Sequence, residues 1–157
     1  ISIFWKKGLL GEKLMFMGSY QNSIDAKSRM IIPSKYRDSL AFRCVVTKGI
    51  DRCLYIYPVS EWDSFAEKLA QLPKSDANAR NFVRHFYANA EECEIDKQGR
   101  ITIPQTLREY AGIEKDLNTM GTGEKIEVWS REIWESDENA VVMDGAEIAE
   151  GMEKYGI

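Results

Sequence analysis

Residues 24–37 read IDAKSRMIIPSKYR, and residues 95–108 read IDKQGRITIPQTLR. An internal repeat of this kind indicates how many building blocks a chain contains. A unit of roughly 45 residues buries little of its own surface, so we expect the two copies to complete one another, within the chain or between chains. After a shift of 71 positions, identical residues meet at six places: Ile24 and Ile95, Asp25 and Asp96, Arg29 and Arg100, Ile32 and Ile103, Pro33 and Pro104, and Arg37 and Arg108.

Each copy predicts a β-hairpin. An extended segment ends at Asp25 or Asp96, a three-residue turn follows, and an apolar strand comes next. Such a turn favours glycine at a position with positive φ, and Gly99 fits that position in the second copy. Ser28 is its counterpart in the first copy, where a non-glycine residue costs on the order of 1 kcal/mol.

Proline ends the apolar strand in both copies, because proline fits the first turn of a helix but not a central strand. We therefore expect short helices over residues 34–41 and 105–111, the second closed by Gly112. A second pair of strands is predicted in each copy, over residues 42–47 and 53–57 in the first and over 117–120 and 126–129 in the second.

Two longer helices are predicted between the copies, over residues 60–72 and 76–90, because their apolar residues recur at helical spacing. Ser60 and Asp63 suggest a capping box at the start of the first. Both apolar stripes are explained by core packing or by an interface with another subunit. The chain's one histidine, His85, is expected on a helix face rather than as a ligand or base.

The composition is typical of a globular protein, with 157 residues, 44% hydrophobic and 29% charged. No apolar run approaches the roughly 18 residues of a membrane span, so we expect no membrane partner. Three cysteines without a CxxC pair argue against a disulfide scaffold or a zinc site. With one histidine and no catalytic or phosphate-binding motif, we expect no enzyme activity, no cofactor, no metal and no small-molecule substrate.

Charge is distributed unevenly along the chain, although the net charge is −4. Residues 19–48 hold six basic and two acidic side chains, whereas residues 131–157 hold two basic and eight acidic ones. A basic head beside an acidic tail is compatible with a nucleic-acid partner. The tail itself is expected to be solvated and partly disordered.

The Asp-x-x-x-Arg element is the only constellation of charged residues that recurs. One interpretation is an ion pair that shapes the turn, although an exposed pair contributes only about 0 to 1 kcal/mol. The other places the arginines on a rim where they bind phosphate or guanine. We favour DNA contact for Arg29 and a mixed role for Arg100. The predicted DNA-binding residues are Asp25, Lys27, Arg29, Lys35, Arg37, Asp96 and Arg100.

Four segments together resemble the MraZ family of transcriptional regulators: MFMG at 15–18, I-D-x-K-x-R-x-x-I-P at 24–33, YPxxEW at 57–62 and ECEIDKQGRIxIPxxLREYAGI at 92–113. The resemblance runs from about Met15 to Trp134. It implies an α+β, mostly β fold, with tandem SpoVT/AbrB-type units forming a swapped-hairpin β-barrel flanked by helices. It also implies a homo-oligomeric ring, a cytoplasmic and nucleoid-associated location, and binding to short direct repeats of double-stranded promoter DNA in the bacterial cell-division and cell-wall gene cluster.

The family's Asp-x-x-x-Arg signature falls on Asp25 and Arg29 and again on Asp96 and Arg100, while Lys27-Ser28 stands where the family has Lys-Gly. The expected organisation has five parts. Residues 1–14 are an N-terminal extension or a remnant of cloning, 19–61 a first DNA-binding unit of the SpoVT/AbrB type, 62–89 connecting helices, 90–133 a second such unit and 134–157 an acidic tail.

Two functions from different classes remain open. In the first, several basic heads tied into one ring bind spaced DNA sites, and avidity compensates for the few phosphate contacts of each head. In the second, the chain is an oligomeric interaction module and DNA binding is incidental. RNA binding is a weaker third possibility, because no aromatic-rich strand motif is present.

Overall fold

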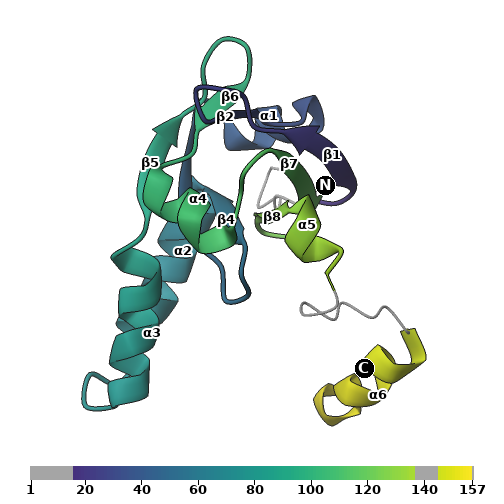
Figure 1. Ribbon diagram of the computed structural model, residues 1–157. Coiled ribbons are helices and arrows are strands. Elements are labelled where there is room, and N and C mark those ends of the chain that lie inside the picture. Colours follow the sequence, from purple (N-terminus) through teal and green to yellow (C-terminus); the bar gives the residue numbers. More distant parts are fainter. Residues whose placement is uncertain (1–15, 137–144, 157) are drawn as a thin grey trace, which may run out of the picture.

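The computed structural model describes residues 16–136 and 145–156 (Figure 1). The α+β class with mostly antiparallel strands is confirmed. One sheet has six strands in the order β1 (Ser19–Ser23), β7 (Asp116–Gly121), β8 (Ile126–Ser130), β4 (Leu54–Pro58), β3 (Arg43–Lys48) and β5 (Glu91–Glu94). A separate ribbon pairs β2 (Arg29–Ile31) with β6 (Arg100–Thr102). The helices are α1 (Ser34–Leu40), α2 (Val59–Ala70), α3 (Ala77–Tyr87), α4 (Gln105–Ala111), α5 (Arg131–Trp134) and α6 (Gly145–Met152), followed by the 3-10 turn η1 (Glu153–Tyr155).

The two copies of the repeat exchange strands within the chain. β1 of the first copy pairs with β7 of the second, and β5 of the second pairs with β3 of the first. The short strands β2 and β6 likewise pair across the copies. Neither copy therefore completes a sheet alone, as expected for units too small to bury their own surface.

The predicted hairpin in each copy was wrong beyond its turn. In the first copy, Asp25 N–H donates to Arg29 O at 2.9 Å, and an isolated bridge joins Ile24 to Met30. The two strands then separate, because the backbone groups of β1 bind β7 and those of β2 bind β6. The turn itself was predicted correctly, since Ser28 has a φ of 63° and Gly99 a φ of 78°.

The central strand β4 is buried on both faces and separates two layers of core. Leu54 and Ile56 lie in the larger layer, between the sheet and the ribbon with α1 and α4. Tyr55 and Tyr57 alternate with them and point into an aromatic layer with α2 and α3. Successive strand residues face opposite sides, so one strand supplies both layers, and the ribbon and the long helices lie on opposite faces of the sheet.

The four helices expected between residues 34 and 111 all form, although α2 ends at Ala70 and α3 at Tyr87, two and three residues before the predicted ends. Gly112 ends α4 in the left-handed region with a φ of 64°, as expected. α3 begins at the Asp76 cap, whose side chain accepts from Asn78 N. The capping box at Ser60 was wrong, because α2 begins at Val59 after Pro58 and has no side-chain cap.

The acidic tail contains a helix that charge alone did not predict. α6 and η1 lie apart from the sheet and its covering helices (Figure 1). The predicted extension over residues 1–14 falls outside the described residues. The two-unit division at residues 19–61 and 90–133 stays a prediction.

The two turns offer a matched stability test. Ser28→Gly removes the cost of a side chain at positive φ and should stabilise the fold by about 0.5 to 1 kcal/mol. Gly99→Ser adds that cost and also forces the guanidinium of Arg37 to shift, so it should destabilise the fold by about 1 to 2 kcal/mol. Thermal unfolding of both variants measures the effects, and shifts of the same sign would contradict the assigned turn geometry.

Candidate nucleic-acid interface

The ribbon of β2 and β6 presents one face to solvent and one to the core. Met30 and Ile101, which are directly paired, point inward and are fully buried. Because strand residues alternate between faces, their neighbours point outward. The outward face is therefore formed by Arg29, Ile31, Arg100 and Thr102.

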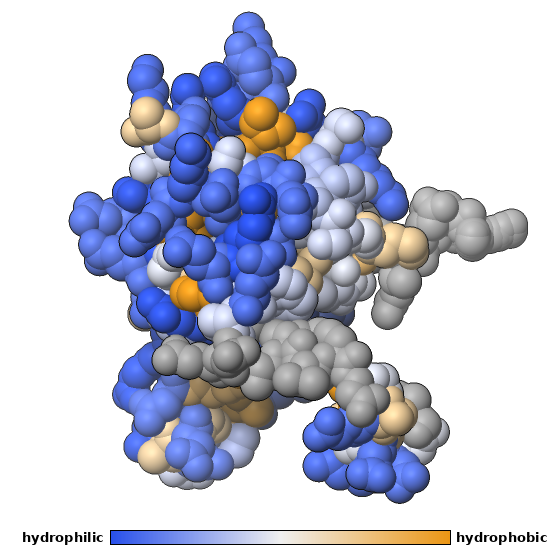
Figure 2. Space-filling view, turned by 45° about the vertical axis from the view of Figure 1, so that its right-hand side comes forward, coloured by the Kyte–Doolittle hydropathy of each residue, from blue (hydrophilic) through white to orange (hydrophobic). Residues whose placement is uncertain are grey.

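Cross-strand register sets the spacing on this face. Arg29 lies opposite Thr102, and Ile31 lies opposite Arg100, so the two arginines stand diagonally across the ribbon. Ile31 is 50% exposed between them. Figure 2 shows a small apolar area within mainly hydrophilic surface at the upper end of the molecule, where β2 and β6 lie in Figure 1.

Each arginine is held by the aspartate that begins its turn. Asp25 Oδ1 accepts the backbone N–H groups of Lys27 and Arg29, both at 2.9 Å, and Oδ2 accepts Nε of Arg29 at 2.9 Å. The second copy repeats this arrangement, with Asp96 accepting from Gln98 N, Arg100 N and Arg100 Nε at 2.9, 2.9 and 2.8 Å. The pair therefore shapes the turn, as the first interpretation expected, and it also fixes Nε of each arginine. Contact of these arginines with DNA stays a prediction.

These hydrogen bonds lower the pKa of both aspartates. For Asp25 the largest cause is the backbone N–H of Arg29, and the Arg29 side chain and the N–H of Lys27 add to it, while partial desolvation opposes them. The pKa of Asp96 is lowered in the same way, first by the backbone N–H of Arg100. Both carboxylates are thus ionised at neutral pH and bind their arginines as charged groups.

The two arginines differ in how their outer nitrogens are bound. Arg100 Nη2 donates to Gln98 Oε1 at 3.1 Å. The corresponding position in the first copy is Lys27, which offers no acceptor. Among the described residues, the recorded side-chain partner of Arg29 is Asp25, through Nε alone. Arg29 therefore has more donors available for a ligand than Arg100, although their side chains are similarly exposed, at 27% and 26%.

Arg37 has a structural role that the sequence did not reveal. Its Nε donates to Ile32 O at 2.8 Å, and its guanidinium packs against Gly99 in the turn of the other copy. Arg108 makes the equivalent bond to Ile103 O at 3.0 Å. Arg37 therefore supports the ribbon from behind, and its contact with DNA stays a prediction.

The two predicted lysines occupy different places. Lys27 is exposed in the first turn, next to Arg29. Lys35 is exposed on α1, and a β-carbon built on Gly18 would lie 3.7 Å from its Nζ, so it sits beside the start of β1 rather than on the ribbon. Sequence reasoning missed Ile31, Thr102 and the exposed Lys97; the alternation along RMI and RIT was the signal that would have identified the first two.

The described residues were also expected to hold no metal site, no membrane-spanning helix and no reactive cysteine or histidine. It holds no group of three or more His, Cys, Asp or Glu side chains that could bind a metal. Nor does it contain a helix long and apolar enough to span a membrane. Burial raises the pKa of the Cys44 thiol to about 12 and that of Cys93 to about 11, so both stay protonated and unreactive. His85 lies on α3, with Nε2 2.8 Å from Gly49 O.

Acidification should weaken the turns. The folded pKa values of Asp25 and Asp96 lie below the ordinary value of 3.8, so their stabilisation is complete above that value and is lost as pH falls through the folded values. Melting temperatures measured from neutral to acid pH should fall less steeply in an Asp25→Asn, Asp96→Asn double variant than in the wild type. Parallel curves would show that the two pairs contribute nothing to stability.

Comparison with known proteins gives one consistent family. The family model described as "MraZ protein, putative antitoxin-like" matches twice, over residues 15–85 and 86–150. Proteins named "Transcriptional regulator MraZ" from Acetivibrio thermocellus and Clostridium tetani are each 50% identical over 143 residues, which is 91% of this chain and all of theirs. The one from Lachnoclostridium phytofermentans is 51% identical over 91% of this chain and 99% of its own. The two matched segments each contain one copy of the internal repeat, and the chain belongs to the MraZ family.

Proposed function

We propose that the chain is a sequence-specific, DNA-binding transcriptional regulator whose contact surface is the outward face of the β2–β6 ribbon. Relatives at about 50% identity carry the name of a transcriptional regulator, which supports the regulatory part of the proposal. The observation that carries the DNA part is the pair of aspartate-oriented arginines on a two-stranded ribbon.

A two-stranded ribbon is one of the two elements that the major groove of B-DNA admits. Arginine donates two parallel hydrogen bonds to guanine or to phosphate, and the exposed Ile31 supplies an apolar surface for a thymine methyl group. Lys27, which is exposed in the adjacent turn, would contact phosphate. Asp25 and Asp96 act as positioning residues, because their carboxylates fix Nε of the arginines. The outer nitrogens of Arg29 would then bind the DNA, whereas Nη2 of Arg100 already donates to Gln98.

One ribbon provides few cationic contacts, and the whole chain is acidic. We therefore infer that copies assemble into a ring and bind short direct repeats together, since linked contacts raise the apparent affinity by roughly 10² to 10⁴. The resemblance points to the promoter of the cell-division and cell-wall gene cluster as target, and to a cytoplasmic, nucleoid-associated protein. The strand exchange supports assignment of the fold to tandem SpoVT/AbrB-type swapped hairpins.

Substitution of the ribbon arginines tests the contact surface. Arg29→Ala should weaken binding to promoter DNA about 10- to 100-fold in a mobility-shift titration, because a lost arginine contact costs roughly 1–3 kcal/mol. Arg100→Ala should have the smaller effect, since Gln98 already binds its Nη2. Arg43→Ala is the matched control, because Arg43 is an exposed arginine paired with Glu92 on the β3–β5 edge. Equal affinity of the Arg29 and Arg43 variants would remove the ribbon from the mechanism.

Salt dependence separates phosphate contact from base contact. Each neutralised phosphate contributes about −0.9 to the slope of log affinity against log salt. Lys27→Ala should flatten this slope by nearly that amount for each DNA-bound copy and weaken binding to all sequences alike. An unchanged slope would place Lys27 away from the backbone of the DNA. A chain that assembles but ignores promoter DNA even at low salt would favour the interaction-module alternative.

A further inference from the structure

The internal repeat and the register of the ribbon describe the same symmetry. A shift of 71 positions relates β2 to β6 residue by residue. In the ribbon, Met30 and its equivalent Ile101 pair at the centre, and the residues on either side pair in reverse order. The outward face therefore has a local two-fold axis, which passes between Met30 and Ile101. This axis relates the two arginines to each other and relates Ile31 to Thr102.

The backbone of the ribbon follows this symmetry. Strands β2 and β6 have the same order of partly buried, buried and exposed residues. Asn22 Nδ2 donates to Ile31 O at 3.1 Å, and the residue equivalent to Asn22 is Cys93, whose Sγ donates to Thr102 O at 3.8 Å. Each of the two carbonyl groups thus has a side-chain partner from its own copy of the repeat. Positions 31 and 102 are equivalent in the ribbon and differ in the chemistry of their side chains.

Side chains break the symmetry at two places. Ile31 is apolar and 50% exposed, whereas Thr102 is exposed and carries a hydroxyl group. In the turns, Gln98 accepts a hydrogen bond from Nη2 of Arg100, whereas its equivalent, Lys27, has no acceptor to offer. The ribbon is therefore symmetric in its backbone and in the positions of its arginines, but asymmetric in the groups that it presents to a ligand.

Cross-strand pairing gives the two ends of the ribbon different chemistry. At one end Arg29 lies opposite Thr102, and we call this pair the polar row. At the other end Ile31 lies opposite Arg100, and we call this pair the apolar row. In the major groove, guanine presents the acceptors for arginine, and the thymine methyl group is the feature that an apolar side chain recognises. Threonine is less selective, because it contacts several bases through its hydroxyl or its methyl group.

We propose that Ile31 is a specificity-determining residue, and that its difference from Thr102 fixes the direction in which the ribbon lies on DNA. A two-fold symmetric protein surface matches a palindromic site, and the two arginines alone would form such a surface. The apolar row selects a half-site with a thymine methyl group against Ile31, while the polar row tolerates other bases. This inference rests on the proposed function, because it requires the ribbon to contact the major groove.

Removal of single methyl groups from the DNA tests this assignment. The probe is the strongest duplex that the wild-type chain selects from a randomised library, with each thymine replaced in turn by deoxyuridine, which lacks only the methyl group. Wild-type affinity should fall roughly 3- to 10-fold at one thymine of the site, since burial of one methyl group contributes about that factor. Ile31→Ala should bind the thymine and deoxyuridine duplexes equally.

Another exposed isoleucine provides the matched control. Ile50 lies in the turn between β3 and β4, and Ile50→Ala should keep the wild-type sensitivity to deoxyuridine. A wild-type chain that is insensitive to every replacement would overturn the proposal, as would an Ile31→Ala variant that keeps full sensitivity. In either case the proposed function survives if Arg29→Ala still weakens binding, so the two failures are distinguishable.

Exchange of the two residues tests the direction. The double variant Ile31→Thr, Thr102→Ile keeps both arginines and moves the isoleucine to the row that contains Arg29. In the sequence that this variant selects, the sensitive thymine should move to the half-site that Arg29 contacts. Arg29→Ala identifies that half-site, because loss of an arginine relaxes specificity at the base it binds. Selection of the wild-type sequence by the exchange variant would overturn the proposal.

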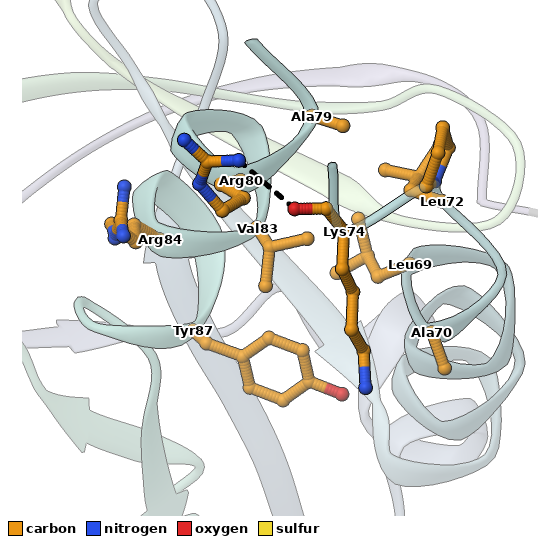
Figure 3. A pocket seen from close by; sticks show the side chains of 10 residues that line it. Leu69, Ala70, Leu72, Lys74, Ala79, Arg80, Val83, Arg84 and Tyr87 are labelled. Atoms are coloured by element: carbon orange, nitrogen blue, oxygen red, sulfur yellow. Dashed lines mark hydrogen bonds between the residues drawn. The ribbon is translucent and has the colours of Figure 1, made fainter. Parts of the chain in front are cut away.

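The helical side of the sheet supplies the control for this exchange. A cavity of about 380 Å³ lies between the end of α2 and the length of α3, and Val83 and Tyr87 are directed into it (Figure 3). Val83→Thr makes a similar change, from a β-branched aliphatic side chain to threonine, on the face of the sheet opposite the ribbon. It should leave the selected sequence unchanged. Circular dichroism spectra that match the wild type show that each variant is folded.

Discussion

The structure depends on the pairing of β2 with β6. Besides the strand register, Ile32 N–H donates to Gly99 O at 2.8 Å and Ile103 N–H donates to Ser28 O at 2.9 Å. Each turn is thereby tied to the strand of the other copy. Buried backbone groups need partners, and these reciprocal bonds provide them only when both copies are present. The exchange of β1 and β5 extends the same dependence to the edges of the six-stranded sheet.

This pairing also builds the candidate site. It fixes two arginines at one spacing on a rigid ribbon, and each is oriented by a carboxylate in its own turn. Behind the ribbon, Arg37 and Arg108 bind the ends of the two strands. Sites on strands supported by a second layer of contacts are held more accurately than sites on free loops. The candidate DNA-contacting arginines, Arg29 and Arg100, and the supporting arginines, Arg37 and Arg108, thus belong to one repeated motif but make different contacts.

The two faces of the six-stranded sheet are covered by different elements. The ribbon, α1 and α4 cover one core layer, while α2 and α3 cover the aromatic layer on the other side. The ribbon that is proposed to contact DNA therefore lies on the face of the sheet opposite the two long helices.

The sequence by itself determined the repeat, the turns, the short helices after each proline and the family, because these follow from local chemistry: positive φ at Ser28 and Gly99, and the fixed φ of Pro33 and Pro104. Only the tertiary structure decided which strands pair. Backbone hydrogen bonds form between N–H and C=O groups whatever the side chains are. A strand that follows a tight turn can therefore pair with its neighbour or with a strand of the distant copy. The same non-local pairing placed Arg29 and Arg100 diagonally across one ribbon and brought the guanidinium of Arg37 against Gly99 of the other copy. Lys35 lies instead beside the start of β1.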